Sequence, residues 1–563
     1  MKVIIVGGVA GGASAAARIR RLDENAQIIM FERSGFVSYA NCGLPYYIGD
    51  VITDPEELTL QTPESFWNRF NINVKVKHEV IALDTSSKSV SVKNLITGEI
   101  FEEHYDKLIL SPGAKPTVPN MSGISSEKVF TLHTVEDTFK IHKFIYENDI
   151  KSAVIAGGGY IGLEMAENLS NKGVDVTIVQ RPNQVMAPLD YDMACQLHGL
   201  LRDKGIKLKF GSSVSGFTES QDKIQTLLKD EPSLTSDIVI LAIGVTPDTK
   251  LAESAGLKLG LKNSIVVNDK METSEKDVYA VGDAVQVKHF VTGEESLISL
   301  AGPANKQGRI AADNICGLDS HYKGSQGSSV IKVFDMTAAT TGINEKTAKA
   351  LNLNYDKVVL FPLSHAGYYP NAVSMAMKVI YEKPTLRLLG AQIVGYDGVD
   401  KRIDVLATAI RAGVSADSLK DLDLAYAPPY SSAKDPVNMA GFMIDNITGS
   451  KLSQFHWEDV DTLPRDGSVT LLDVRTPYEY NSKHSDGFVN IQVDELRKHM
   501  EQLPKEKPVY VMCQSGLRSY IACRMLSQSG FECYNLSGGF GFLNSIKEEQ
   551  IAASKSYPCG LTR

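Results

Sequence analysis

Short apolar runs alternate with glycine-rich turns and helix-forming segments through the first half of this 563-residue chain. Residues 2–6 are apolar, residues 7–12 are a glycine-rich turn, residues 13–22 are helix-forming, and residues 28–31 are apolar again. The same order returns at residues 153–156, 157–162, 163–169 and 175–179. Apolar runs that alternate with helical segments are typical of buried parallel strands. The pattern therefore predicts two strand–turn–helix–strand units.

Both predicted turns have the composition of a dinucleotide-binding turn. The first reads GGVAGG, with Val9 in place of the usual middle glycine, and the second reads GGGYIG. Such glycines let the backbone approach a pyrophosphate at the positive end of a helix, and Glu32 lies where a carboxylate accepts hydrogen bonds from a ribose. One turn of this kind can serve helix–sheet packing alone. Two in one chain imply electron transfer between two bound cofactors.

Three further segments extend the pattern. The apolar runs at residues 108–110 and 238–243 are followed by glycine and proline, so each is expected to be a strand that ends in a turn. The run at residues 278–281 leads into Gly282 and Asp283. As a set, these motifs resemble the two-dinucleotide-binding flavoprotein disulfide reductases over residues 1–445. The resemblance implies that Asp283 binds the ribityl chain of FAD.

The resemblance also implies the residues of an FAD site and of an NADH or NADPH site. These residues are Gly7, Gly8, Ala10, Gly11, Gly12, Glu32, Arg33, Asn41, Val80, Ser111, Pro112, Gly113, Gly157, Gly159, Tyr160, Ile161, Gly162, Gln180, Arg181, Gly244, Gly282, Asp283 and Ala301. The preferred reductant stays open. Arg181 suits a 2′-phosphate, whereas Gly162 is the more NADH-like residue at the end of its turn.

The pattern changes after residue 326. β-Branched stretches at residues 329–334, 357–361, 374–381 and 388–394, with a helix at 404–412, predict an α+β domain. In the resembling family this domain forms a homodimer and lends residues to the partner's active site. Residues 447–455 are expected to be a linker to a further unit.

The C-terminal segment resembles a single-domain rhodanese over residues 456–545. An apolar run at residues 508–512 enters Cys513, which opens a glycine-containing loop before a helix. Backbone N–H groups and the helix dipole stabilise a thiolate or persulfide at such a position, and Arg518 adds positive charge. Residues 483–487 depart from the usual glycine-histidine-apolar-proline-glycine run of that family.

The expected fold is therefore α/β, with two Rossmann-like dinucleotide-binding domains, an α+β dimerisation domain and a C-terminal α/β rhodanese domain. The expected boundaries are residues 1–113 and 246–325 for FAD binding, 114–245 for NAD(P)H binding, 326–446 for dimerisation, 447–455 for the linker and 456–563 for the rhodanese domain.

Cys42 narrows the function because the next cysteine in the chain is Cys195. Glutathione and lipoamide reductases carry a second cysteine a few residues away, and the single-cysteine peroxidases usually place a histidine where this chain has Ala10. Residues 38–47 instead resemble coenzyme A disulfide reductase, in which the lone cysteine holds a mixed disulfide with coenzyme A. Tyr368 and Tyr426 match the two tyrosines that reach the sulfur in that family. The implied coenzyme A contacts are Ser14, Arg18, Arg21, Ser38, Asn41, Asn305 and Lys434.

Composition sets the remaining limits. The net charge of −9 argues against nucleic acid as a partner, and no apolar stretch is long enough to span a membrane. Seven cysteines without a CxxC pair indicate a cytoplasmic protein with reduced thiols. Cys195, Cys316 and Cys523 are expected to be buried, and Cys533 and Cys559 receive no role.

The resulting hypothesis is a homodimeric flavoenzyme that uses NADH or NADPH to reduce coenzyme A persulfide or coenzyme A disulfide through Cys42, while Cys513 handles sulfane sulfur. The sequence does not rank these substrates against polysulfide. Two alternatives stay open: a single-cysteine peroxidase or oxidase, and a sulfur carrier or redox sensor.

Overall fold

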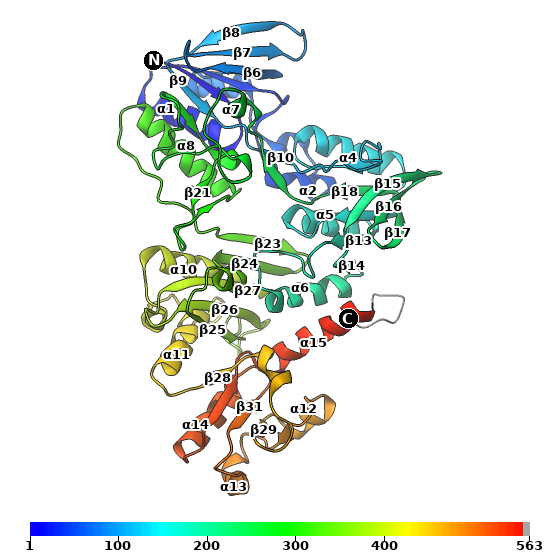
Figure 1. Ribbon diagram of the computed structural model, residues 1–563, viewed down its shortest axis with the longest axis vertical. Coiled ribbons are helices and arrows are strands. Elements are labelled where there is room, and N and C mark those ends of the chain that lie inside the picture. The colour runs from blue at the N-terminus through cyan, green and yellow to red at the C-terminus, as the bar shows by residue number, and fades with distance from the viewer. Residues whose placement is uncertain (556–563) are drawn as a thin grey trace. The chain divides into compact units, whose positions relative to one another are not determined.

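A computed structural model describes residues 1–555, so Cys559 lies outside the described residues. The chain divides into two compact units. The first comprises residues 1–183 and 205–327, and the second comprises residues 184–204 and the chain from residue 328 onward. Figure 1 lets the element order be followed by colour.

The first unit contains two parallel five-stranded sheets. Their strand orders are β20-β9-β1-β2-β5 and β11-β18-β12-β13-β14. The strands of the first sheet are β1 (Lys2–Val6), β2 (Gln27–Glu32), β5 (Asn73–Val76), β9 (Lys107–Leu110) and β20 (Val278–Ala280). Those of the second are β11 (Val129–Phe130), β12 (Ser152–Ala156), β13 (Asp175–Gln180), β14 (Lys207–Phe210) and β18 (Ile238–Leu241). Both predicted strand–turn–helix–strand units are present.

Helices cover these sheets, and a three-stranded antiparallel sheet accompanies each of them. The helices are α1 (Ala10–Leu22), α2 (Leu44–Ile48), α3 (Pro63–Phe70), α4 (Val135–Glu147), α5 (Tyr160–Asn171), α7 (Lys250–Ser254) and α8 (Ala301–Ile315). The antiparallel strands are β6 (His78–Asp84), β7 (Ser89–Asn94), β8 (Ile100–His104), β15 (Val214–Ser220), β16 (Lys223–Leu228) and β17 (Glu231–Ser236). The first core is aliphatic on both sheet faces, with Ile4 on one face and Ile5 on the other.

The second unit contains an antiparallel sheet and a parallel sheet. The antiparallel order is β23-β24-β27-β26-β25, and the parallel order is β28-β32-β31-β29-β30. The antiparallel strands are β23 (Ser329–Val333), β24 (Met336–Gly342), β25 (Tyr355–Leu360), β26 (Met375–Glu382) and β27 (Leu388–Gly395). The parallel strands are β28 (Gln454–Phe455), β29 (Thr470–Asp473), β30 (Val489–Asn490), β31 (Val509–Met512) and β32 (Cys533–Leu536).

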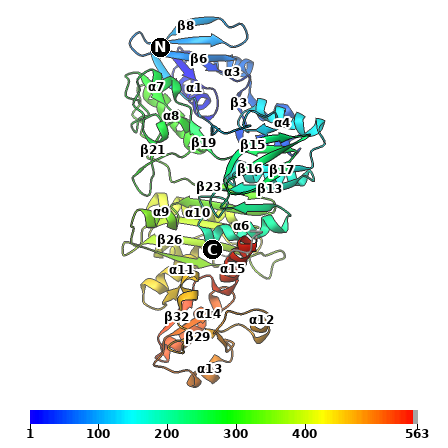
Figure 2. The same cartoon turned by 45° about the vertical axis from the view of Figure 1, so that its right-hand side comes forward.

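The helices of the second unit include one from an earlier part of the chain. They are α6 (Tyr191–Asp203), α9 (Glu345–Ala350), α10 (Val399–Ala412), α11 (Pro436–Thr448), α12 (Pro477–Ser482), α13 (Leu496–His499), α14 (Leu517–Gln528) and α15 (Gly539–Lys555). Helix α6 lies beside α15 in both ribbon views (Figures 1 and 2), and Gln196 Nε2 donates a hydrogen bond to Ser545 Oγ. The stretch expected as a linker contains the end of α11 and all of β28.

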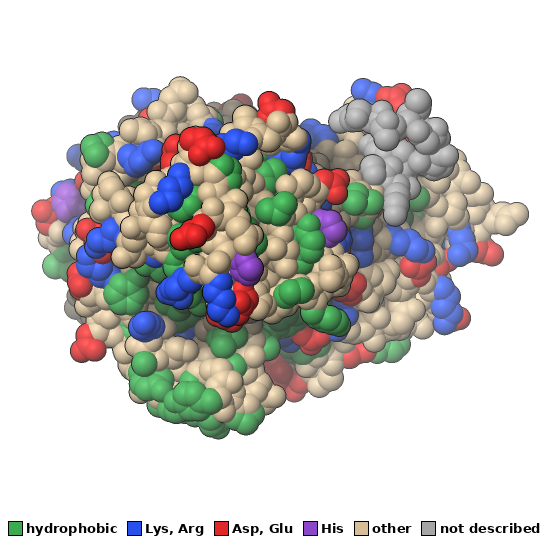
Figure 3. All heavy atoms as spheres, turned by 90° about the horizontal axis from the view of Figure 1, so that it is seen from below, with side chains coloured by type: hydrophobic (Ala, Val, Ile, Leu, Met, Phe, Trp, Pro, Cys, Tyr) green, Lys and Arg blue, Asp and Glu red, His purple; other side chains and the backbone are tan. Residues whose placement is uncertain are grey.

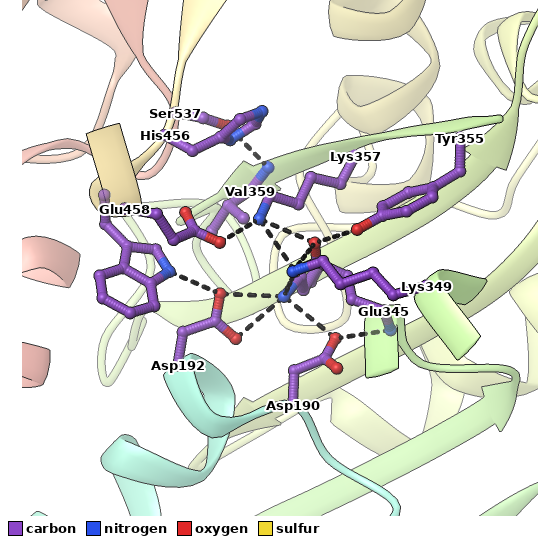
Figure 4. Close-up of polar contacts among 12 residues, drawn as sticks. Asp190, Asp192, Glu345, Lys349, Tyr355, Lys357, Val359, His456, Glu458 and Ser537 are labelled. Atoms are coloured by element: carbon purple, nitrogen blue, oxygen red, sulfur yellow. Dashed lines mark hydrogen bonds and ion pairs between the residues drawn. The ribbon is translucent and has the colours of Figure 1, made fainter. Parts of the chain in front are cut away.

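A buried cluster of charges joins α6 to both sheets of the second unit. Lys378 Nζ, which is fully buried in β26, lies 3.0 Å from Asp190 and 2.9 Å from Asp192 and also pairs with Glu345. Lys357 Nζ bridges Glu345 and Glu458, and Figure 4 shows the carboxylates of Asp190, Asp192 and Glu345 converging. The indole of Trp457 donates to Asp192 Oδ2 at 3.2 Å. Three buried carboxylates surround the single ammonium of Lys378, and Lys357 adds a second positive charge at Glu345, so the two lysines offset part of the negative charge of the cluster.

The surface mixes both signs of charge. On the face seen in Figure 3, lysine and arginine side chains are interspersed with aspartate and glutamate. Across residues 1–555, no helix combines the length and the apolar character needed to cross a bilayer.

Candidate active site

Cys42 lies exposed in a short 3₁₀ turn, Asn41–Gly43, that leads directly into α2. The turn is held by the Gly43 N–H, which donates to Ala40 O at 2.8 Å. Ser38, just upstream, has a φ of +48°, and its N–H donates to Gly8 O at 2.8 Å. The backbone from the first glycine turn to Cys42 is thus tied together, although Ser38 adopts a conformation that favours glycine.

Two carboxyl groups influence the Cys42 thiol. Desolvation raises the pKa of Cys42, and the charges of Glu164 and Asp283 raise it further. Burial also raises the pKa of Glu164 to about 7. Glu164 lies in α5, the helix that follows the second glycine turn, so this turn brings a titratable carboxyl group to the cysteine. Sequence reasoning did not identify Glu164, because nothing in its surrounding pattern distinguishes it from a helical surface residue.

The first glycine turn has the shape that a dinucleotide requires. A Cβ on Gly12 would lie 2.0 Å from Gly7 O, so only glycine permits this close turn. Glu32 is buried and accepts hydrogen bonds from the Gly8 and Ser34 N–H groups, each at 2.8 Å. Gly113 has a φ of +69° with nothing within 4 Å of its Cβ position, which leaves open space beside the turn after β9.

Asp283 supplies a second indication of an FAD site. It lies in a short turn after β20, and burial raises its pKa to about 6. No hydrogen bond from a described residue offsets this effect of burial, although a partly buried carboxylate favours such donors. A ribityl hydroxyl would supply one. The residues present therefore fit FAD.

The remaining predicted FAD residues lie in several elements of the first unit. Arg33 pairs with Asp248 at 2.7 Å, and the Val80 side chain is buried in the core. Ala301 begins α8, while Ala10 and Gly11 begin α1. Ser111, Pro112 and Gly282 lie in the turns after β9 and β20.

The second glycine turn repeats the geometry of the first. A Cβ on Gly162 would lie 2.0 Å from Gly157 O, whereas Gly159 and Gly244 face open space. Tyr160 and Ile161 begin α5 above this turn. Gln180 Oε1 accepts a hydrogen bond from the Gly158 N–H at 3.1 Å, and Arg181 beside it is exposed. These residues fit a pyridine dinucleotide, with a neutral amide in place of the acid that would mark NADH.

The coenzyme A candidates of the first unit lie mainly on α1 and α8. The Ser14 hydroxyl donates to Asn305 Oδ1, so the structure brings these two residues together. Arg18 is engaged by Asp313, with Nε and Oδ1 2.6 Å apart, and its side chain is only 18% exposed. Arg21 is exposed in the last turn of α1. Arg21 is therefore freer than Arg18 to meet a phosphate.

The two candidate tyrosines lie together in the second unit. Tyr368 OH and Tyr426 OH are 2.7 Å apart, and the two side chains are 75% and 46% exposed. Their hydrogen bond raises the pKa of Tyr368. Lys434 is exposed just before α11. Two phenols in contact, both open to solvent, can deliver a proton to a leaving thiolate.

A buried arginine organises the loops that carry these tyrosines. Arg402 is 1% exposed, and its Nη2 donates to Ser364 O at 2.9 Å and to Tyr430 O at 3.2 Å. The same nitrogen pairs with Asp435 Oδ2 at 3.1 Å. Arg402 therefore fixes both tyrosine loops from behind. Sequence reasoning did not identify Arg402, because an arginine in a helix is usually exposed.

Cys513 lies fully buried at the base of a tight loop before α14. Its Sγ accepts hydrogen bonds from the Gly516 N–H and the Ser519 hydroxyl, each at 3.2 Å. Gly516 has a φ of +94°, which orients its N–H inward. The first residues of α15 complete the loop, because the Phe540 N–H donates to Cys513 O at 2.7 Å. These donors suit a thiolate or a persulfide anion.

Arg518 departs from the simple expectation that it serves the sulfur alone. Its guanidinium forms two hydrogen bonds with Glu479, at 2.8 and 2.7 Å. Ser519 and Glu479 were both missed by sequence reasoning. Ser519 directly follows Arg518 in the sequence, so its spacing from Cys513 could have identified it.

Comparisons with known proteins identify three family matches along the chain. Residues 1–308 match the model of the pyridine nucleotide-disulphide oxidoreductases, residues 328–436 match the dimerisation domain of that family, and residues 456–541 match the rhodanese-like domain. The chain is 38% identical to the coenzyme A disulfide reductase of Staphylococcus aureus over 442 residues, which are 78% of this chain and 99% of that protein.

Two solved structures are similar over nearly the whole chain. One is the reduced CoADR-RHD of Bacillus anthracis, with 48% identity, a TM-score of 0.95, and coverage of 97% of this chain and 98% of that one. The other is an NAD-dependent persulfide reductase from A. fulgidus, with 37% identity, a TM-score of 0.90, and coverage of 96% and 100%. A water-forming NADH oxidase from Lactobacillus brevis is 28% identical, with a TM-score of 0.76, and the match covers 80% of this chain and 99% of that one. The predicted fold class is confirmed.

Proposed function

Because the chain belongs to the pyridine nucleotide-disulphide oxidoreductase family, we propose that this oxidoreductase uses NAD(P)H to reduce coenzyme A persulfide or coenzyme A disulfide, with FAD as its cofactor. The observation that carries the proposal is Cys42, an exposed thiol beside Glu164 and Asp283 without a nearby second cysteine in the sequence. Such a thiol pairs with a sulfur from outside or is oxidised by oxygen species. The similar proteins name coenzyme A and persulfides as the sources of that sulfur.

Each half-reaction balances at Cys42. Its thiolate attacks the coenzyme A-bound sulfur of the persulfide, which releases hydrosulfide and leaves a mixed disulfide between Cys42 and coenzyme A. With coenzyme A disulfide, the leaving group is coenzyme A thiolate instead. FAD, when bound, would transfer an electron pair from NAD(P)H to that mixed disulfide. Tyr368 and Tyr426 would protonate the departing thiolate.

Several finer assignments belong to the same proposal. The functional boundaries are those expected from the sequence, with FAD at residues 1–113 and 246–325, NAD(P)H at 114–245, and the rhodanese part from residue 456. The match to a dimerisation domain supports a homodimer in which one protomer lends its tyrosines to the other. Reduced, unpaired cysteines support a cytoplasmic location. Cys513 would hold sulfane sulfur in the same chain as the reductase.

The intact mass of the purified protein, before and after dithiothreitol, tests the proposal. We expect a coenzyme A-sized adduct that dithiothreitol removes and that Cys42→Ser abolishes. Cys316→Ser, a partly exposed cysteine of the same unit, is the matched control and should keep the adduct. Rapid peroxide turnover without an adduct would contradict the proposal in favour of a peroxidase or oxidase. An adduct without NAD(P)H oxidation would identify a sulfur carrier or sensor instead.

A further inference from the structure

The rhodanese loop has a feature that the sulfur chemistry of Cys513 does not require. Arg518, whose positive charge would attract an anionic sulfur donor, is bound on two sides by Glu479. Both side chains are about one third exposed, so the pair lies at the surface of the loop region. Arg518 lowers the pKa of Glu479 to about 2, which keeps this carboxylate charged at any physiological pH. The negative charge of Glu479 therefore offsets the positive charge of Arg518 at any physiological pH.

The Glu479 side chain is also fixed in place. It begins α12 together with Thr476, whose N–H and hydroxyl both donate to Glu479 Oε2, at 2.9 and 2.8 Å. The Glu479 N–H returns a hydrogen bond to Thr476 Oγ1, which completes a capping box. Because Oε1 and Oε2 are both used, the carboxylate cannot turn away without losing contacts at two helices.

A second arginine near the loop is neutralised in the same way. Arg475 is 2% exposed, and it pairs with Asp473 at 2.7 Å while its Nη1 lies 3.5 Å from Gln514 Oε1. Uncharged side chains are exposed next to the Glu479–Arg518 pair. Tyr478 is 86% exposed and Leu517 is 57% exposed, and each directly precedes one member of the pair. The surroundings of Cys513 are thus electrically balanced and partly apolar.

We propose that Glu479 is a positioning residue that sets the class of sulfur donor at Cys513. By pairing with Arg518, Glu479 weakens the binding of small inorganic dianions such as thiosulfate. Organic persulfides are affected less, because their sulfur carries a single negative charge and their organic arm is apolar. This inference deepens the proposed function and rests on Cys513 as a sulfane sulfur site. The pairing acts on donor binding, because Glu479 does not contact Cys513 Sγ.

Both donor reactions balance without another reactant. The Cys513 thiolate attacks the outer sulfur of thiosulfate, the sulfur–sulfur bond breaks, and sulfite leaves with the electron pair. With an organic persulfide anion, the same attack transfers the outer sulfur and releases the organic thiolate. In each case Cys513 becomes a persulfide anion, and cyanide then removes the sulfur as thiocyanate. The two donors differ in charge, −2 against −1.

Thiocyanate formation by the full-length protein measures the selectivity. The two donors are thiosulfate and the persulfide of 2-mercaptoethanol. A unit charge about 8 Å from a dianion, in a medium of effective dielectric about 40, corresponds to roughly a thirtyfold change in binding before screening by salt. We therefore expect Glu479→Gln to lower the KM for thiosulfate by about tenfold or more, with kcat nearly unchanged and a smaller change for the persulfide.

Two further variants separate charge from structure. Thr476→Val removes the capping partner without changing charge and should leave the KM ratio of the two donors unchanged. Arg518→Gln leaves the charge of Glu479 unopposed and should raise the KM for thiosulfate. Adding Glu479→Gln to that variant makes the pair uncharged again and should return the KM ratio toward the wild-type value. If Glu479→Gln folds poorly, as judged by Trp457 fluorescence, Glu479→Ala provides the same loss of charge.

Equal changes in KM for both donors, or a KM for thiosulfate that Arg518→Gln leaves unchanged, would overturn the inference. NAD(P)H-dependent reduction of coenzyme A disulfide is measured on the same samples. Absence of that activity in the wild-type protein would contradict the proposed function. An unchanged ratio of the two KM values in Glu479→Gln would contradict only the role of Glu479.

Discussion

Replacing Lys378 by methionine should destabilise the second unit far more than the replacement of an exposed residue. Lys378 is completely buried and is the shared partner of Asp190, Asp192 and Glu345. Methionine fills a similar volume but leaves those carboxylates facing one another. Removing one partner of a buried ion pair costs about 3–5 kcal/mol, because the remaining charge stays buried without compensation. We expect a loss of that size in the free energy of unfolding.

The assay uses the two tryptophans of the chain. Trp457 hydrogen bonds to Asp192 within the cluster, whereas Trp67 is 57% exposed in the first unit. In a Trp67→Phe background, urea unfolding followed by fluorescence therefore reports on Trp457 alone. With a denaturant dependence of about 3 kcal/mol per molar urea, the midpoint should fall by about 1 M or more.

Lys349→Met is the matched control. Lys349 lies 3.9 Å from the same Glu345, but it is 63% exposed. Exposed ion pairs contribute about 0–1 kcal/mol, so this variant should shift the midpoint little. Equal midpoint shifts for the two lysine variants would refute the conclusion that the buried ammonium of Lys378 stabilises the three carboxylates.

The pH dependence gives an independent check. Burial alone would raise the pKa of Glu345, but Lys378 and Lys357 lower it well below its usual range. A depressed folded-state pKa contributes stability that is present above the unfolded pKa of about 4.3 and is lost as the pH falls below it. Without Lys378, protonation of the carboxylates relieves their repulsion. The difference between wild type and Lys378→Met should therefore shrink as the pH falls below about 4.3, and a difference that stays constant down to about pH 3 would contradict the reasoning.

Three other changes test the site. Arg402→Ala should lower the free energy of unfolding by about 3 kcal/mol, because it leaves Asp435 buried without its partner. It should also lower kcat for coenzyme A disulfide more than it changes KM, because the loops of Tyr368 and Tyr426 lose their shared contact. An unchanged kcat and an unchanged urea midpoint would contradict this. Arg181→Ala should raise the KM for NADPH about tenfold while changing that for NADH less than about threefold, and equal effects on both would remove Arg181 from the reductant site. Glu164→Gln should shift the pH profile of Cys42 alkylation by iodoacetamide to lower pH, since the Glu164 charge raises the pKa of the thiol; a profile that does not move would exclude that influence.

Local patterns predicted the elements that depend on local chemistry. Both glycine turns, the strands before them and the Cys513 loop are where the sequence indicated, because glycine geometry and apolar runs act over a few neighbouring residues. The helices begin earlier than expected, at residue 10 instead of 13 and at residue 160 instead of 163. Strand β24, Met336–Gly342, was not predicted, since its small residues gain strand structure only by pairing with β23 and β27.

The sequence could not predict which charged residues pair with partners that are distant in the chain. Arg18 stays a predicted coenzyme A contact, but its ion pair with Asp313 on α8 could not be inferred from the sequence. Lys378 had a signal, because it is a single lysine within the otherwise apolar run 375–381. Its three acidic partners could not be inferred, since Asp192 lies 186 residues away in the chain. The pairing of Arg518 with Glu479 was hidden for the same reason.

The position of α6 limits how the protein can be divided by engineering. The helix is encoded between β13 and β14 of the first unit, but its residues belong with the second. A fragment expressed from residue 328 would contain Lys378 and Lys357 without Asp190 and Asp192, and it would leave Glu549 without its ion-pair partner Arg202. A functional excision of the second unit must therefore graft residues 184–204 onto it, and a rhodanese domain transplanted onto another reductase loses the α6 partners of Glu549 and Ser545 unless the host offers a similar helix.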